Sequence, residues 1–121
     1  MARFLELRSL VLSEMPEEVL SECKEYALGF NMEECCGIII KDNGKLIFKP
    51  CDNISSNKQS FFVINPLDMI CDGIEYIFHS HWQVSEQPSF DDIKSSDELC
   101  IPFLIYSSLT DKFCLYPNIS V

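Results

Sequence analysis

One segment, residues 75–99, constrains the fold more than any other part of this chain. It begins with an apolar strand pattern that ends in two histidines, His79 and His81. A polar loop, Trp82–Pro88, follows, and Ser89 then begins a helix that we expect to continue to the end of the segment. A strand joined to a helix in this way indicates an α/β or α+β layer, in which helices cover a sheet.

Other patterns supply the remaining elements of that layer. Apolar residues recur at helical spacing from Pro16 to Gly29, with Ser13 placed to cap the helix. Asn65, followed by proline, begins a short helix that ends near Gly73. The predicted strands are Cys36–Lys41, Lys45–Lys49, Ser60–Ile64, Glu75–Ser80, Phe103–Ser107 and Lys112–Tyr116. Their order predicts a mixed sheet flanked by helices.

The whole chain is predicted to form one domain. Its 121 residues suit a single hydrophobic core, and a hydrophobic fraction of 47% is ordinary for a folded protein. No linker or low-complexity tract marks a boundary, so we assign residues 1–121 to one domain. The apolar runs are far shorter than the ~20 residues of a membrane helix, which argues against a membrane partner. The N-terminus also lacks the pattern of a secretory signal.

The formal net charge of −10 restricts the partners that the chain can bind. Binding to a nucleic-acid backbone depends on Lys and Arg neutralising phosphates, so this charge argues against nucleic acid as the main partner. An acidic surface suits a basic protein partner, and it also keeps a protein soluble. Solubility alone is the simpler interpretation.

The chain has seven cysteines, an odd number without any C-x-x-C pair. Most of them stand next to apolar residues, and a free cysteine behaves as a small core hydrophobe. We therefore expect reduced, mostly buried thiols and a cytosol-like compartment. The spacing disfavours a structural zinc site with four cysteine ligands.

Two histidines and a nearby aspartate form a candidate metal site. His79 and His81 occupy alternate positions of a strand, so both imidazoles face one side. Asp92 lies in the first turn of the next helix, where the loop can return it to the strand end. These ligands leave a fourth tetrahedral position for water, as in catalytic zinc sites. Two other interpretations stay open: a histidine pair satisfied by backbone hydrogen bonds, and a capping box between Ser89 and Asp92 that leaves one carboxylate face free.

The spacing of these residues resembles the signature of a known enzyme family. H-x-H at His79–His81, seven residues, and S-x-x-D at Ser89–Asp92 is the pattern of the JAMM (MPN-plus) zinc metallopeptidases, which include deubiquitinase-like isopeptidases. The family's E-x-C-G motif resembles Glu34–Gly37, which implies that Glu34 is the catalytic acid/base. Glu33 is the neighbouring alternative, and the glycine spacing favours Glu34. The resemblance covers most of the chain and implies the JAMM/MPN fold, which is cytidine-deaminase-like, with Zn²⁺ as cofactor.

Six motifs are similar to a narrower group, the JAMM domain of lambda-like phage tail assembly proteins. They lie at Glu34–Gly37, Pro50–Asn53, Phe62–Pro66, His79–His81, Gln87–Ser89 and Ile101–Phe103. This resemblance implies a role in phage tail assembly, with tail proteins as partners, in the cytoplasm of a bacterial host or in the virion tail. In that group a papain-like cell-wall peptidase domain commonly follows; here it has been removed, or the chain is a stand-alone version.

The resemblance also implies a hydrolytic mechanism. Zinc on His79, His81 and Asp92 would lower the pKa of a water molecule. Glu34 would accept the water's proton and return it to the leaving amine, and Ser89 would donate a hydrogen bond to the developing oxyanion. The substrate would be a protein or peptide, cleaved at a peptide or isopeptide bond after the tail of a ubiquitin-like fold.

Trp82 departs from the family pattern, which usually has proline directly after the second histidine. A tryptophan leaves the loop freer and offers a large flat surface at the mouth of the site. It is interpreted either as a substrate-binding aromatic residue or as a side chain packed against the adjacent helix, and the second interpretation is slightly favoured. The change affects substrate preference rather than metal binding.

Two further functions remain alternatives to an active phage-tail peptidase. The chain could be a non-catalytic assembly module of the tail tip, with a structural or idle metal. It could also be a bacterial regulator that removes ubiquitin-like tags, which shares the chemistry and differs only in its partner. Retention of both histidines, Asp92, Ser89 and Glu34 favours an enzyme, because a scaffold does not need them together.

Overall fold

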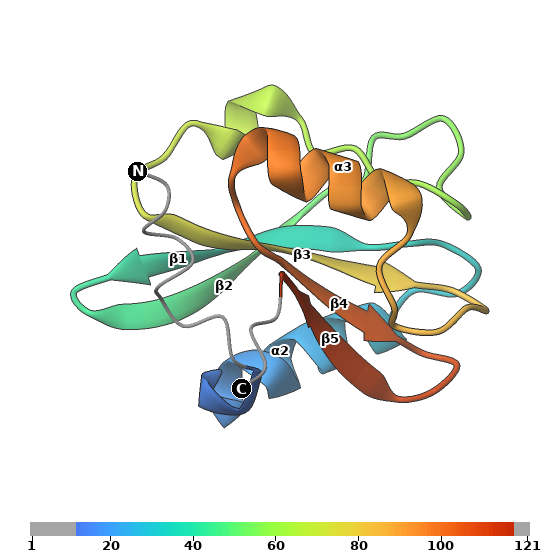
Figure 1. The fold of residues 1–121 in the computed structure, drawn as a ribbon, viewed down its shortest axis with the longest axis horizontal. Coiled ribbons are helices and arrows are strands. Elements are labelled where there is room, and N and C mark those ends of the chain that lie inside the picture. Colours follow the sequence, from blue (N-terminus) through green and yellow to red (C-terminus); the bar gives the residue numbers. More distant parts are fainter. Residues whose placement is uncertain (1–11, 118–121) are drawn as a thin grey trace.

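A mixed five-stranded sheet organises residues 12–117, the part of the chain that this computed structural model describes (Figure 1). The strands are β1 (Cys36–Asp42), β2 (Lys45–Cys51), β3 (Ile74–His81), β4 (Phe103–Ser107) and β5 (Lys112–Tyr116). The helices are η1 (Leu12–Glu14), α2 (Glu17–Leu28), η2 (Pro66–Met69) and α3 (Phe90–Leu99). The predicted class, a mixed sheet flanked by helices in one α+β domain, is confirmed. No helix within the described range is long and apolar enough to cross a membrane.

β3 lies in the middle of the sheet, whose strand order is β2-β1-β3-β4-β5. β1 forms an antiparallel hairpin with β2 and pairs antiparallel with β3 along its other edge. β3 and β4 are parallel, and α3 makes the crossover that a parallel pair requires. Because β3 has a partner on both edges, its C-terminal end is held in register, with His79 opposite Cys36 on one side and Ile105 on the other.

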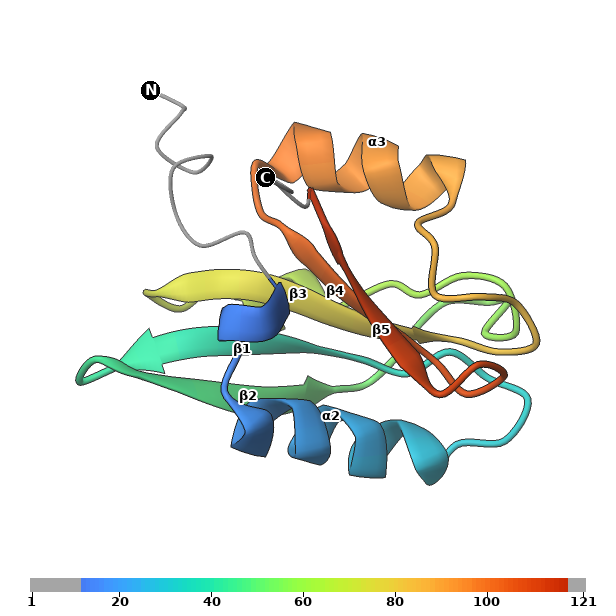
Figure 2. The ribbon, with the colours of Figure 1, turned by 60° about the horizontal axis from the view of Figure 1, so that its bottom comes forward.

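Helices cover both faces of the sheet (Figure 2). α2 packs on the face whose buried cluster includes Phe78. α3 and the segment between β2 and β3 cover the opposite face, where Ile77 and Phe103 are buried. Alternate residues of a strand face opposite sides, so His79 and His81 share the face of Ile77, on the side of α3. The fold therefore brings the end of β3 and the start of α3 together.

β1 and β2 approach each other closely at Gly37. A Cβ atom added there would lie 2.5 Å from Cε1 of Phe48 and 2.7 Å from the carbonyl oxygen of Lys49. We expect Gly37→Ala to lower the free energy of unfolding by about 1–3 kcal/mol, because the added methyl group forces this packing apart. Chemical denaturation should detect almost no change for Gly29→Ala, whose Cβ would be 3.4 Å from its nearest neighbour. An unchanged midpoint for Gly37→Ala would contradict the close approach.

The strand predicted at Ser60–Ile64 is wrong. The segment is extended but makes only an isolated bridge between Asn53 and Ile64. The amide side chain of Asn53 takes the place of a strand partner: it donates to the carbonyl of Phe61 at 3.0 Å and accepts from the Val63 amide at 3.1 Å. Side-chain hydrogen bonds therefore satisfy backbone groups that a ladder would otherwise pair.

The helix ends differ in part from the sequence prediction. Pro16 is the N-cap of α2, which begins one residue later, so Ser13, whose side chain lies outside the described part, is not at the cap. η2 begins as predicted, with the Asn65 side chain accepting from the Leu67 amide at 3.0 Å. It is a single 3₁₀ turn and ends at Met69 rather than near Gly73.

All seven cysteines lie in the described region and are free. Four of them, Cys23, Cys35, Cys36 and Cys51, are buried as expected. Cys71 and Cys100 are exposed despite their apolar sequence neighbours, because both follow a helix end. Burial raises the pKa of Cys35 to about 11 and that of Cys36 to about 12. These thiols therefore stay protonated at neutral pH, which agrees with a packing role rather than a nucleophilic one.

Candidate metal centre

The capping box at the start of α3 aims Asp92 at the end of β3. The Ser89 hydroxyl accepts a hydrogen bond from the Asp92 amide at 3.1 Å. In return, the Ser89 amide donates to Oδ2 of Asp92 at 2.9 Å. This reciprocal pair is the predicted capping box, and it fixes the carboxylate in the first turn of the helix. The remaining face of the carboxylate is turned toward the histidines.

The three expected ligands converge. Nε2 of His79 lies 3.0 Å from Oδ1 of Asp92, and Nε2 of His81 lies 3.0 Å from Oδ2. One ligand atom from each residue lies within 4.8 Å of the others, and all three residues are buried. Imidazole nitrogens with one carboxylate oxygen suit zinc and other divalent transition metals. The chain thus has a buried group that can hold one metal ion.

The hydrogen-bonding state of His81 favours a cation at its Nε2. Its Nδ1 lies 2.6 Å from the carbonyl oxygen of Ser85, which can only accept, so Nδ1 carries a proton. In a neutral ring Nε2 then presents a lone pair to the carboxylate of Asp92. The lone pair of Nε2 and the carboxylate oxygen are both acceptors, so they repel each other unless a proton or a metal ion lies between them. A carbonyl on the far nitrogen is also the usual arrangement for a metal-bound histidine.

His79 supplies a second, independent sign of a metal. Its side chain is fully buried, and within residues 12–117 neither ring nitrogen has a hydrogen-bond partner. Its contact with Asp92 lacks the geometry of a hydrogen bond. A buried polar atom without a partner destabilises the folded state. A divalent ion would satisfy Nε2, so the residues present fit a metal.

The pKa shifts of the ligands agree with this chemistry. Burial lowers the pKa of His79 and outweighs the nearby Asp92, so the ring is neutral. Burial alone would raise the pKa of Asp92, but contacts with both imidazoles hold it well below its usual range. Burial also disfavours the charged form of His81, yet Asp92 and the Ser85 carbonyl together raise its pKa. Metal binding must therefore displace a proton at His81.

Glu34 is held beside the metal site by its own backbone. Its amide donates to the Lys58 carbonyl at 2.7 Å, and its carbonyl accepts from the Asn53 side chain at 2.8 Å. The next residue, Cys35, exchanges two hydrogen bonds with Ser80, the residue between the histidines. Glu34 is 6% exposed and lies outside the ligand group. Its position is that of a neighbour to the metal and not of a fourth ligand.

In the metal-free protein, Glu34→Gln should increase stability at high pH. Burial, the largest cause, raises the pKa of Glu34 from 4.5 to about 7, with a smaller rise from Asp92 and an opposing effect of His81. The folded state therefore keeps a proton that the unfolded chain releases. As the pH rises from 4.5 to about 7, the free energy of unfolding falls. This pKa difference corresponds to a loss of roughly 3 kcal/mol in the free energy of unfolding.

Urea denaturation in the presence of a chelator checks this expectation. Wild type and Glu34→Gln should be equally stable at pH 4, and the variant should be more stable at pH 8. A stability difference that is the same at both pH values would show that the Glu34 carboxylate is not buried as described.

A pocket of about 960 Å³ opens over two of the ligands, His81 and Asp92. Glu34 lines it, whereas Glu33 lines a separate depression, which agrees with the glycine spacing that favours Glu34. Ser89 and Trp82 also line the pocket, the latter partly buried. The structure thus brings five of the sequence-predicted site residues to one cavity, whereas His79 is fully buried beside His81 and does not line it. A substrate contact for Trp82 stays a prediction.

No family model and no curated protein match this chain. The chain shares its fold with a protein from Desulfitobacterium hafniense. That solution structure, a structural-genomics target, aligns with a TM-score of 0.61 and 19% sequence identity. The alignment covers 82% of this chain and 77% of the other. Likeness at this level of identity shows the fold alone.

Ser107 is a supporting residue that the sequence did not single out. It is fully buried at the end of β4, and its hydroxyl donates to the Val84 carbonyl at 2.6 Å. The same oxygen accepts from the amides of Leu109 and Thr110, so both lone pairs are used and its proton is committed to Val84. Val84 adjoins Ser85, whose carbonyl orients His81. Ser107 therefore anchors the loop that positions a candidate ligand.

We expect Ser107→Ala to weaken metal binding about tenfold, the smaller end of the range for groups that orient ligands. Co²⁺ titration, followed by visible absorption, measures this affinity without requiring activity. Ser108→Ala is the matched control, because that side chain is exposed one position further on. If Ser107→Ala binds Co²⁺ like the wild type while only its melting temperature falls, the serine supports the turn and not the ligand.

Proposed function

We propose that this protein is a zinc-dependent peptidase of the JAMM type that hydrolyses a peptide or isopeptide bond. The observation that carries the proposal is the buried His79–His81–Asp92 group, two members of which, His81 and Asp92, line the same pocket as Glu34. Three protein ligands with an open side are typical of catalytic zinc, whereas structural zinc is closed by four. The sequence pattern of the JAMM family gives the same assignment.

Each residue has a separate task in this mechanism. When bound, a zinc ion acidifies water and polarises a carbonyl group. Glu34 accepts the proton of the attacking water and later gives it to the leaving amine. Its pKa, raised to about 7 by burial, suits both transfers near neutral pH.

Ser89 is proposed to stabilise the oxyanion. Its oxygen accepts the Asp92 amide, and no hydrogen bond donated by its hydroxyl occurs among the described residues. The proton is therefore available to a substrate in the pocket that Ser89 lines. Such a donor contributes on the order of 3 kcal/mol to the transition state.

The biological setting of the proposal comes from the sequence resemblance. It favours a protein substrate with a ubiquitin-like tail and a role in phage tail assembly, in a bacterial host or a virion tail. Metal analysis and cleavage assays test the enzymatic claim. One zinc per chain, with chelator-sensitive cleavage of a ubiquitin-like fusion or a tail protein, would support it. Full zinc occupancy without cleavage of any of these proteins would favour a non-catalytic assembly module.

A further inference from the structure

We propose that the substrate carries a large aliphatic or aromatic side chain within one residue of the scissile bond. This side chain would sit in an apolar arm of the pocket, next to the metal ligands. The inference rests on the proposed peptidase function and adds the chemical class of its substrate. The apolar arm is lined by Phe62, Ile64, Met69, Ile77, Leu99 and Phe103.

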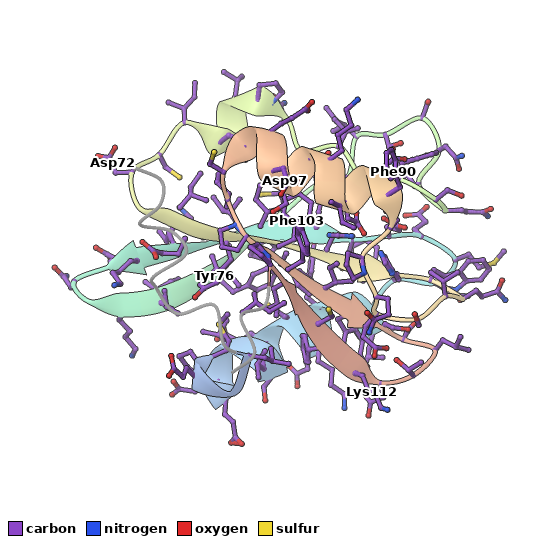
Figure 3. All side chains as sticks on the ribbon, viewed as in Figure 1. Asp72, Tyr76, Phe90, Asp97, Phe103 and Lys112 are labelled. Carbon is purple, nitrogen blue, oxygen red and sulfur yellow. The ribbon has the colours of Figure 1, made fainter. Side chains whose placement is uncertain are left out.

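The apolar arm begins at a metal ligand. The ring of Phe62 stacks on the imidazole of His79, with centroids 4.3 Å apart and planes inclined by 18°. Phe103 meets the same imidazole edge-on at 5.6 Å and meets Phe62 at 5.9 Å. Figure 3 shows Phe103 beneath α3, between that helix and the sheet. No polar residue therefore separates the ligand from the arm, and a side chain next to the scissile bond can reach it.

Two separate parts of the chain form the walls of this arm. Leu99 at the end of α3 stands on one side and is 49% exposed. The extended segment that includes Phe61 and Val63 stands on the other side, and these two side chains are 47% and 45% exposed. Apolar side chains left open around a concave site are typical of ligand binding.

Outside the metal site and Glu34, the charged side chains that line the pocket lie at its rim. Asp91, Lys94 and Glu98 of α3 line it but are exposed, whereas the floor consists of buried Ile77 and Phe103. A charged substrate side chain on this floor would lose water and find no partner. A glycine would leave the floor unfilled. An apolar side chain of substantial size therefore matches the chemistry of the arm.

Hydroxamates provide a test that does not depend on knowing the substrate. The hydroxamate group binds an open position on zinc, and the attached side chain then reports on the arm. We would titrate the zinc-loaded full chain with the hydroxamates of N-acetylglycine, N-acetylleucine and N-acetylaspartate, using calorimetry. The leucine compound should bind about 10- to 100-fold more tightly than the glycine compound. The aspartate compound should bind no more tightly than glycine.

A matched pair of variants locates the effect. Leu99→Asp should remove most of the leucine advantage because it places a charge in the arm. Leu109→Asp is the control, since Leu109 is 63% exposed in the β4–β5 turn and lies outside the pocket lining. The control should keep the full advantage.

The outcomes separate this inference from the proposed function. Equal binding of the glycine and leucine compounds would overturn the apolar arm while leaving the open zinc position intact. Failure of all three compounds to bind the zinc-loaded chain would contradict the open position, and with it the proposed peptidase.

Discussion

Glu34→Gln should keep its metal and lose hydrolysis by on the order of 10³-fold. Glutamine has nearly the same shape as glutamate, but its amide cannot accept the water's proton. Glu34 lies outside the ligand group, so metal content should not change. Measurement of kcat/KM together with zinc content per chain distinguishes loss of the base from loss of the metal.

Glu33→Gln is the natural control for this experiment. The two glutamates are adjacent, yet Glu33 lines a different depression from the one above the ligands. Its variant should retain wild-type kcat/KM. Full activity in Glu34→Gln, or an equal loss in both variants, would contradict the assignment of Glu34 as the base.

His81→Ala should weaken metal binding by at least about 100-fold. Zinc sites derive roughly 3 kcal/mol or more from each ligand, so removing one of three leaves little affinity near neutral pH. His81 is the most informative ligand to remove. His79→Ala would also open a cavity between Phe62 and Phe103, and Asp92→Ala would break the capping box of α3.

Competition with a coloured zinc chelator measures this affinity. Added zinc should also raise the melting temperature of the wild type and not that of His81→Ala. Asp91→Ala provides the control, because this acid precedes Asp92 on α3 but does not belong to the ligand group. Wild-type zinc affinity in His81→Ala would exclude the proposed ligand set.

Local patterns were sufficient to predict most of the fold and the ligand group. The alternation of residues in β3 places both histidines on one face, whatever the rest of the chain does. The spacing of Ser89 and Asp92 predicts a capping box, which is a property of one helical turn. Because these patterns involve only residues that are close in the sequence, they can be interpreted without knowledge of the tertiary structure.

Contacts between distant residues could not be predicted in the same way. Ser107 acts on the loop through Val84, which is 23 positions away. The side chain of Asn53 takes the place of a strand partner for Phe61. For this reason the segment predicted to be a strand is extended but forms only an isolated bridge. Neither residue type carries a sequence signal for such a role. The choice of Glu34 over Glu33, by contrast, rested on the spacing to Gly37, and the two side chains lie in separate pockets in agreement with it.

Anomalous scattering at the zinc edge, from crystals grown with zinc, would test the metal centre most directly. We expect one peak per chain, about 2.0–2.2 Å from Nε2 of His79, Nε2 of His81 and a carboxylate oxygen of Asp92. A fully occupied zinc ion held by other residues, or no peak between these three side chains at saturating zinc, would contradict the metal centre.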